Sequence, residues 1–132
     1  MISMYAMFYN CHSLKTLNLK NFDTSSVNNM QQMFASCYSL EFLDIISFNT
    51  SNVKTMEGMF MDCHSLKSLN LYNFDTSKLA ISSYMFININ NDIVICNDEK
   101  KQTNIMTILS NYSFNINCSN FCLTNSKTKI YY

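Results

Sequence analysis

An internal repeat constrains the fold of this chain more than any other feature of its sequence. The dipeptide Met-Phe marks the 26-residue register, and it recurs as Met7-Phe8, Met33-Phe34, Met59-Phe60 and Met85-Phe86. Columns of Cys, Leu and Phe keep the same spacing between these anchors. A unit this short cannot bury its own apolar residues, so successive units must stack on one another.

Each unit combines two different spacings of apolar residues. One stretch has the three- and four-residue spacing of a helix face, as in Val27, Met30, Met33, Phe34 and Cys37. A second stretch alternates apolar and other residues around Leu43 and Ile45, which is typical of a strand. We therefore predict parallel strands near residues 16–20, 42–46 and 68–72, and helices or helical turns near residues 27–36 and 53–62.

These elements predict an α/β repeat solenoid, with parallel strands on one face and short helices or helical turns on the other. Residues 1–86 would form three and a fraction 26-residue units, and residues 87–132 a degenerate C-terminal capping region. Within that region we predict a helix over residues 103–112 and strands over residues 93–95, 114–118 and 129–132. Residue 1 falls at the register position of Val27, which favours a fragment of a longer array.

The unit also carries the motif of a known family. The segment from Leu40 to Ile45 reads Leu-x-x-Leu-x-Leu with Ile at the last position, and it resembles the strand motif of leucine-rich repeats. The fuller unit resembles the 26-residue repeat of BspA-like bacterial and protist surface proteins. The resemblance implies a cell-surface or extracellular, leucine-rich-repeat-like module for adhesion, which binds a protein or a glycan.

Composition argues against several other classes of function. The net charge is zero and the chain has no Arg, so we expect no nucleic acid partner. No apolar run approaches the roughly 20 residues that span a bilayer, and the first residues do not read as a signal peptide. Gly58 is the only glycine, which leaves no glycine-rich phosphate loop. Without a nucleophile, base and orienting group in sight, we expect neither an enzyme nor a cofactor.

The outward residues of the strands are the candidate binding face. They lie in three columns one unit apart: Thr16, Phe42 and Ser68; Asn18, Asp44 and Asn70; Lys20, Ile46 and Tyr72. In repeat proteins such a continuous surface is where partners bind. The alternative is that these are ordinary solvated positions, and that the chain is a structural spacer or truncated repeat segment. We also consider self-association through the open N-terminal unit.

The six cysteines fall into two groups. Cys11, Cys37 and Cys63 end the apolar stripe of each unit, and we expect them to be buried thiols. A disulfide between two of Cys96, Cys118 and Cys122 is the favoured interpretation in an oxidising compartment. Zinc at Cys11-His12 and Cys63-His64 is disfavoured, because the pairs lie two units apart, so we expect no metal.

Overall fold

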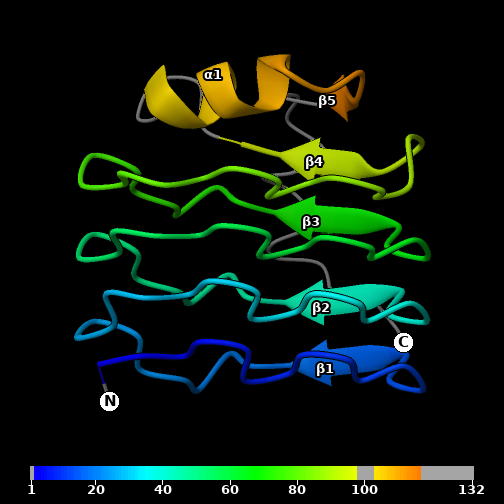
Figure 1. The fold of residues 1–132 in the computed structure, drawn as a ribbon, viewed down its shortest axis with the longest axis horizontal. Helices are drawn as coiled ribbons and strands as arrows, with labels where there is room; N and C mark the ends of the chain where they lie inside the picture. The colour runs from blue at the N-terminus through cyan, green and yellow to red at the C-terminus, as the bar shows by residue number, and fades with distance from the viewer. Residues whose placement is uncertain (1, 98–102, 117–132) are drawn as a thin grey trace.

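The computed structural model describes residues 2–97 and 103–116, and these residues form a stack of register-matched units (Figure 1). One sheet of parallel strands runs through the stack in sequence order. Its strands are β1 (Thr16–Asn18), β2 (Phe42–Asp44), β3 (Ser68–Asn70), β4 (Val94–Cys96) and β5 (Asn115–Ile116). The helix α1 (Thr103–Ser110) lies between β4 and β5 in the chain.

Strand pairing follows the period of the repeat. Leu17 pairs with Leu43, and Ser68 pairs with Val94. The parallel strands predicted at residues 16, 42 and 68 are therefore confirmed, although each ends earlier than expected. The strands end early because a side chain closes a turn there: the Asn18 Oδ1 accepts a hydrogen bond from the Lys20 N–H at 3.1 Å. We call residues 2–27, 28–53, 54–79 and 80–97 the first to fourth units.

The side opposite the sheet contains turns but no helix over residues 27–36 or 53–62, so the prediction of helices there is wrong. Within the second unit the Met33 N–H donates to the Met30 carbonyl (3.3 Å), whereas the Met30 N–H donates to Thr55 of the third unit (3.0 Å). Gln32 and Ser36 have φ values of 53° and 60°. A right-handed helix needs negative φ throughout and keeps its hydrogen bonds internal. We call residues 29–36, and the equivalent residues of the other units, the turn row.

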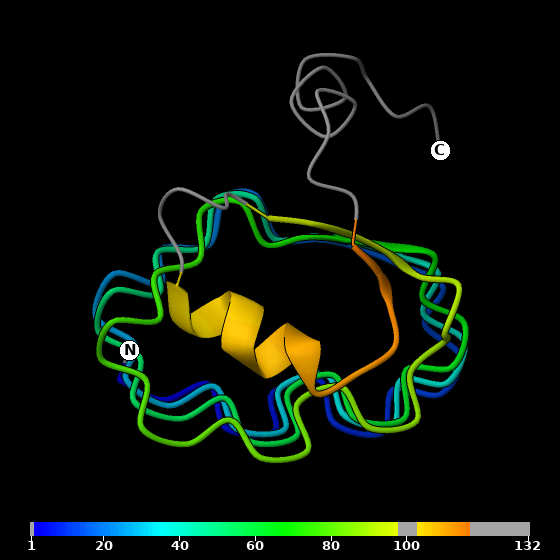
Figure 2. The same cartoon turned by 90° about the horizontal axis from the view of Figure 1, so that it is seen from above.

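The core lies between the sheet and the turn row. The expected apolar stripe is buried even though it is not helical, and Met33, Met59 and Met85 are fully inside. Four phenylalanine rings run through the stack with centroids 5.6 to 5.8 Å apart: Phe8, Phe34, Phe60 and Phe86. Figure 2 shows the units superimposed around this core when the stack is seen end-on.

The predicted C-terminal helix is confirmed over residues 103–110, and it covers the end of the core (Figure 2). Ile105 and Leu109 are buried, and the rings of Tyr112 and Phe114 meet Phe86 at 5.7 and 5.8 Å. The strand predicted over residues 93–95 appears as β4, and β5 lies inside the strand predicted over residues 114–118. The strand predicted over residues 129–132 lies outside the described residues. Within the described ranges, no helix is long and apolar enough to cross a membrane.

Candidate binding surface

Six of the nine residues predicted for the binding face flank the central residues of β1, β2 and β3, on the outer side of the sheet. Each strand turns its central leucine toward the core, so that its two flanking residues face outward. Pairing places Thr16 beside Phe42 and Phe42 beside Ser68. Asn18 stands beside Asp44 in the same register, and Asn70 occupies the equivalent position of β3. Lys20, Ile46 and Tyr72 follow shortly after the strands.

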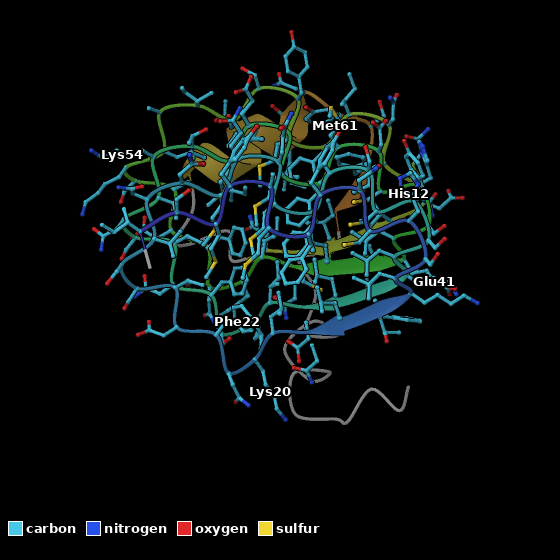
Figure 3. All side chains as sticks on the ribbon, turned by 60° about the horizontal axis from the view of Figure 1, so that its bottom comes forward. His12, Lys20, Phe22, Glu41, Lys54 and Met61 are labelled. Carbon is cyan, nitrogen blue, oxygen red and sulfur yellow. The ribbon has the colours of Figure 1, made fainter. Side chains whose placement is uncertain are left out.

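Exposure changes along this face. Thr16, Asn18 and Lys20 of the first unit are exposed, and Lys20 projects from the body beside the end of β1 (Figure 3). Their equivalents in the second and third units are half-buried. The Nζ of Lys67 lies 5.2 Å from the centroid of the Phe42 ring, a cation–π contact. The large apolar groups of the face, Phe42, Ile46 and Tyr72, are therefore only partly exposed.

The residues of the middle column, Asn18, Asp44 and Asn70, close the turns at the ends of the strands. The Asp44 Oδ1 accepts the Ile46 N–H at 3.3 Å, and the Asn70 Oδ1 accepts the Tyr72 N–H at 2.9 Å. Both repeat the turn that Asn18 makes in the first unit. A short side chain with an acceptor oxygen meets this need, which explains the Asn and Asp residues at this position of the first three units.

A charged column at the entry to the strands escaped the sequence interpretation. Lys15, Glu41 and Lys67 share one register position, and Glu41 forms an ion pair with Lys67. The hydrogen bond from Lys67 holds the pKa of the Glu41 carboxyl below its usual value, and the positive charge of Lys67 adds to the effect. The alternation of sign at one register position was the signal in the sequence that could have revealed this column.

An aromatic column borders the candidate face. The Tyr38 ring lies between those of His12 and His64, with centroid distances of 4.6 and 5.4 Å. All three side chains are exposed, and Figure 3 shows His12 and Glu41 on the same side of the molecule. The tyrosine that separates the two histidines is thus packed against both of them.

Two thiols of the repeat are buried and hydrogen-bonded. The Cys37 Sγ donates to the Phe8 carbonyl at 3.1 Å, and the Cys63 Sγ donates to the Phe34 carbonyl at 3.2 Å. Burial raises the pKa of Cys37 to about 11 and that of Cys63 to about 12. Cys11 is half-buried, and all three are free thiols.

The second group of cysteines lies near the C-terminal end. Cys96, the last residue of β4, is disulfide-bonded. Cys118 and Cys122, the other two disulfide candidates, lie outside the described residues. The pairing among these three cysteines stays a prediction.

Stacked units with parallel strands in one register define the class of this protein: a repeat-like, parallel-strand fold. The chain belongs to the family described as Mycoplasma protein of unknown function, DUF285, whose family model matches residues 2–121. That match spans all four units and α1. Comparisons with curated proteins and with solved structures gave no match.

Proposed function

We propose that this protein is a non-enzymatic binding module of the cell surface, built as a leucine-rich-repeat-like solenoid whose strand face contacts a protein or a glycan. The observation that carries the proposal is the outer side of the sheet. There the half-buried Phe42, Ile46 and Tyr72 lie on or just after neighbouring strands, among polar groups. Aromatic and aliphatic anchors ringed by polar side chains are typical of binding hot spots.

The two outer columns of the face are the ones we expect to select the partner. In the column of Phe42 the other units carry Thr16 and Ser68, and in the column of Ile46 they carry Lys20 and Tyr72. The repeat does not require one residue type at these positions, so their chemistry is free to suit a partner. The middle column is committed to turns, so it contributes mainly the second oxygen of Asp44.

The experiment exchanges outer-column residues for those that a neighbouring unit already carries. Phe42→Thr and Ile46→Lys remove the apolar anchors, and the equivalents Thr16 and Lys20 indicate that the backbone tolerates them. Lys54→Glu, an exposed position away from the sheet (Figure 3), is the matched control. We expect adhesion to cell-surface extracts or glycan arrays to fall with the first two changes only, at unchanged melting temperature.

A structural spacer is the second candidate, and the turn column favours it. Asn18, Asp44 and Asn70 are nearly uniform from unit to unit because they shape the strand ends, as a spacer would also require. A spacer would tolerate Phe42→Thr and Ile46→Lys without loss of any adhesion. Protease treatment of intact cells tests the surface location separately: digestion of the protein only after lysis would contradict it.

A further inference from the structure

The hydrogen bonds between turn rows have a fixed direction. The Phe34 N–H donates to the Met59 carbonyl of the next unit (3.0 Å), while the Met33 carbonyl accepts from the Phe8 N–H of the preceding unit (2.9 Å). The other row positions repeat this pattern. In the first unit the equivalent carbonyl groups therefore face the outer side of the stack as a row of acceptors, on Ser3, Tyr5, Met7 and Tyr9.

The residues of this outer unit keep the character of core residues although nothing described covers them. Met7 is 41% exposed, whereas its equivalents Met33 and Met59 are 0% exposed. Phe22, labelled in Figure 3, is half-buried, whereas the equivalent Phe48 is buried. The first unit thus presents the same apolar pattern that the inner units use to pack on one another.

The rim of the first unit is also more apolar than the rims of the inner units. Ile2 and Tyr5 are 67% and 55% exposed. The second unit has Asn28 and Gln31 at these positions. A terminal unit that faces water in a repeat protein carries a polar outer surface. This surface has the opposite composition, which indicates that it is a contact surface.

We propose that the outer edge of the first unit docks one further unit of the same repeat, parallel and in register, through the amide edge of that unit. A row of acceptors requires a row of donors, and the amide edge of a repeat unit supplies it at the right spacing. The docked unit would stack a phenylalanine ring on Phe8. It would also accept the Cys11 thiol hydrogen, as Phe8 accepts that of Cys37.

A second copy of this chain does not offer a matching edge. If the first units of two copies faced each other, the carbonyl groups of one turn row would lie against the carbonyl groups of the other. The opposite end of the stack is covered by α1 (Figure 2). This inference concerns a different surface from the strand face and does not depend on it.

The experiment joins a copy of residues 28–53 directly ahead of Ile2 in the full chain. The control joins the same segment with its residues in shuffled order. Cys11 is the reporter, because it is half-buried now and would be covered by a docked unit. We expect its alkylation rate in the folded chain to fall at least about tenfold with the repeat unit, and to stay unchanged with the shuffled segment.

Two outcomes would overturn the proposal. One is equal alkylation of Cys11 in both fusions, or a repeat fusion that does not fold while the shuffled fusion does. The other concerns the chain without any fusion, for which we expect a monomer in sedimentation and a Cys11 alkylation rate independent of protein concentration. Concentration-dependent protection of Cys11 would show that a second copy occupies the edge.

Discussion

The Thr24 side chain and the Asn49 backbone exchange two hydrogen bonds across neighbouring units. The Thr24 Oγ1 donates to the Asn49 carbonyl at 3.0 Å and accepts from the Asn49 N–H at 2.8 Å. Thr50 makes the same pair with Asp75, at 2.9 and 2.7 Å. Both hydroxyls are buried, and a hydroxyl can satisfy a donor and an acceptor together at this corner.

Replacement of Thr50 tests this corner. Thr50→Val keeps the shape but removes the hydroxyl, which leaves the Asp75 N–H and carbonyl without their partner. We expect the free energy of unfolding to fall by about 1–3 kcal/mol, the penalty of unsatisfied polar groups. Thr50→Ser keeps the hydroxyl and should lose only about 0.8 kcal/mol, the value of one methyl group. Urea unfolding measures both, and a valine variant as stable as the serine variant would contradict the assignment.

The left-handed turns give a second prediction. Gly58 has a φ of 58°, and a Cβ built there would lie 3.4 Å from the Cγ of Gln32. Space for a Cβ is therefore adequate, and the cost of a substitution comes from the left-handed backbone conformation. We expect Gly58→Ala to destabilise the protein by about 1–2 kcal/mol and Gly58→Asn by less, because Asn tolerates this conformation better. Ser83→Ala, with no such φ, should change stability by less than about 0.5 kcal/mol. Equal thermal shifts for both alanine variants would show that the turn is not strained.

Thiol reactivity is the third prediction. The raised pKa values of Cys37 and Cys63 and their burial leave almost no accessible thiolate near neutral pH. We expect iodoacetamide to modify Cys11 first, and to modify Cys37 and Cys63 only as fast as the chain opens. Mass spectrometry of the time course provides the measurement. Early labelling of Cys63, or a bridge between Cys37 and Cys63, would refute the core position of the thiols.

The fourth prediction concerns the loss of stability at acidic pH. Hydrogen bonds from the Ser77 hydroxyl and N–H keep the pKa of Asp75 below 3.8. Because the pKa is lowered in the folded state, the carboxylate stabilises the fold at every pH above its ordinary pKa. This contribution disappears as the pH falls through the lowered pKa. We expect the urea midpoint to fall as the pH is lowered from about 5 through 3.8 and below it.

Asp75→Asn is the matched variant for this prediction, because Asn49 makes the same turn with Ser51 at 3.1 Å. It should retain the turn and show a shallower dependence on pH than the natural chain. An identical slope in both proteins would mean that Asp75 contributes nothing to acid sensitivity, and that groups such as Glu41 account for it.

The strands were predictable because their signal is local and repeated. Leu17, Leu43 and Leu69 recur once in every unit, and any stack of such units must pair them in parallel. The helix at residues 103–110 was predictable for a similar reason, since Ile105 and Leu109 lie one helical turn apart. In both cases the apolar spacing is compatible with only one type of element, with one side buried.

The turn row was not predictable from the same kind of pattern. Met30, Met33 and Phe34 have helical spacing, and they are buried as a helix face would be. What excludes a helix is that the Met30 N–H finds its acceptor on Thr55, which belongs to the next unit of the stack. Spacing alone contains no information about such a partner, so the apolar pattern predicted the wrong element.

The candidate face was predictable in its position but not in its exposure. Register alone placed Phe42 and Asp44 on the outer side of the sheet. It did not show that Lys67 covers the Phe42 ring, or that Asp44 closes a turn with Ile46. Both contacts involve side-chain conformations, which the period of a repeat does not determine.

The direction of the hydrogen bonds in the turn row has a mechanical consequence. They join residues about one unit apart and lie along the axis on which the units stack (Figure 1). A force that draws the first unit away from the rest loads only the bonds of one boundary at a time. Each rupture would release one unit of the repeat, or roughly 90 Å of extended chain. Under tension the molecule should therefore lengthen at low force in equal steps, each step corresponding to the release of one unit.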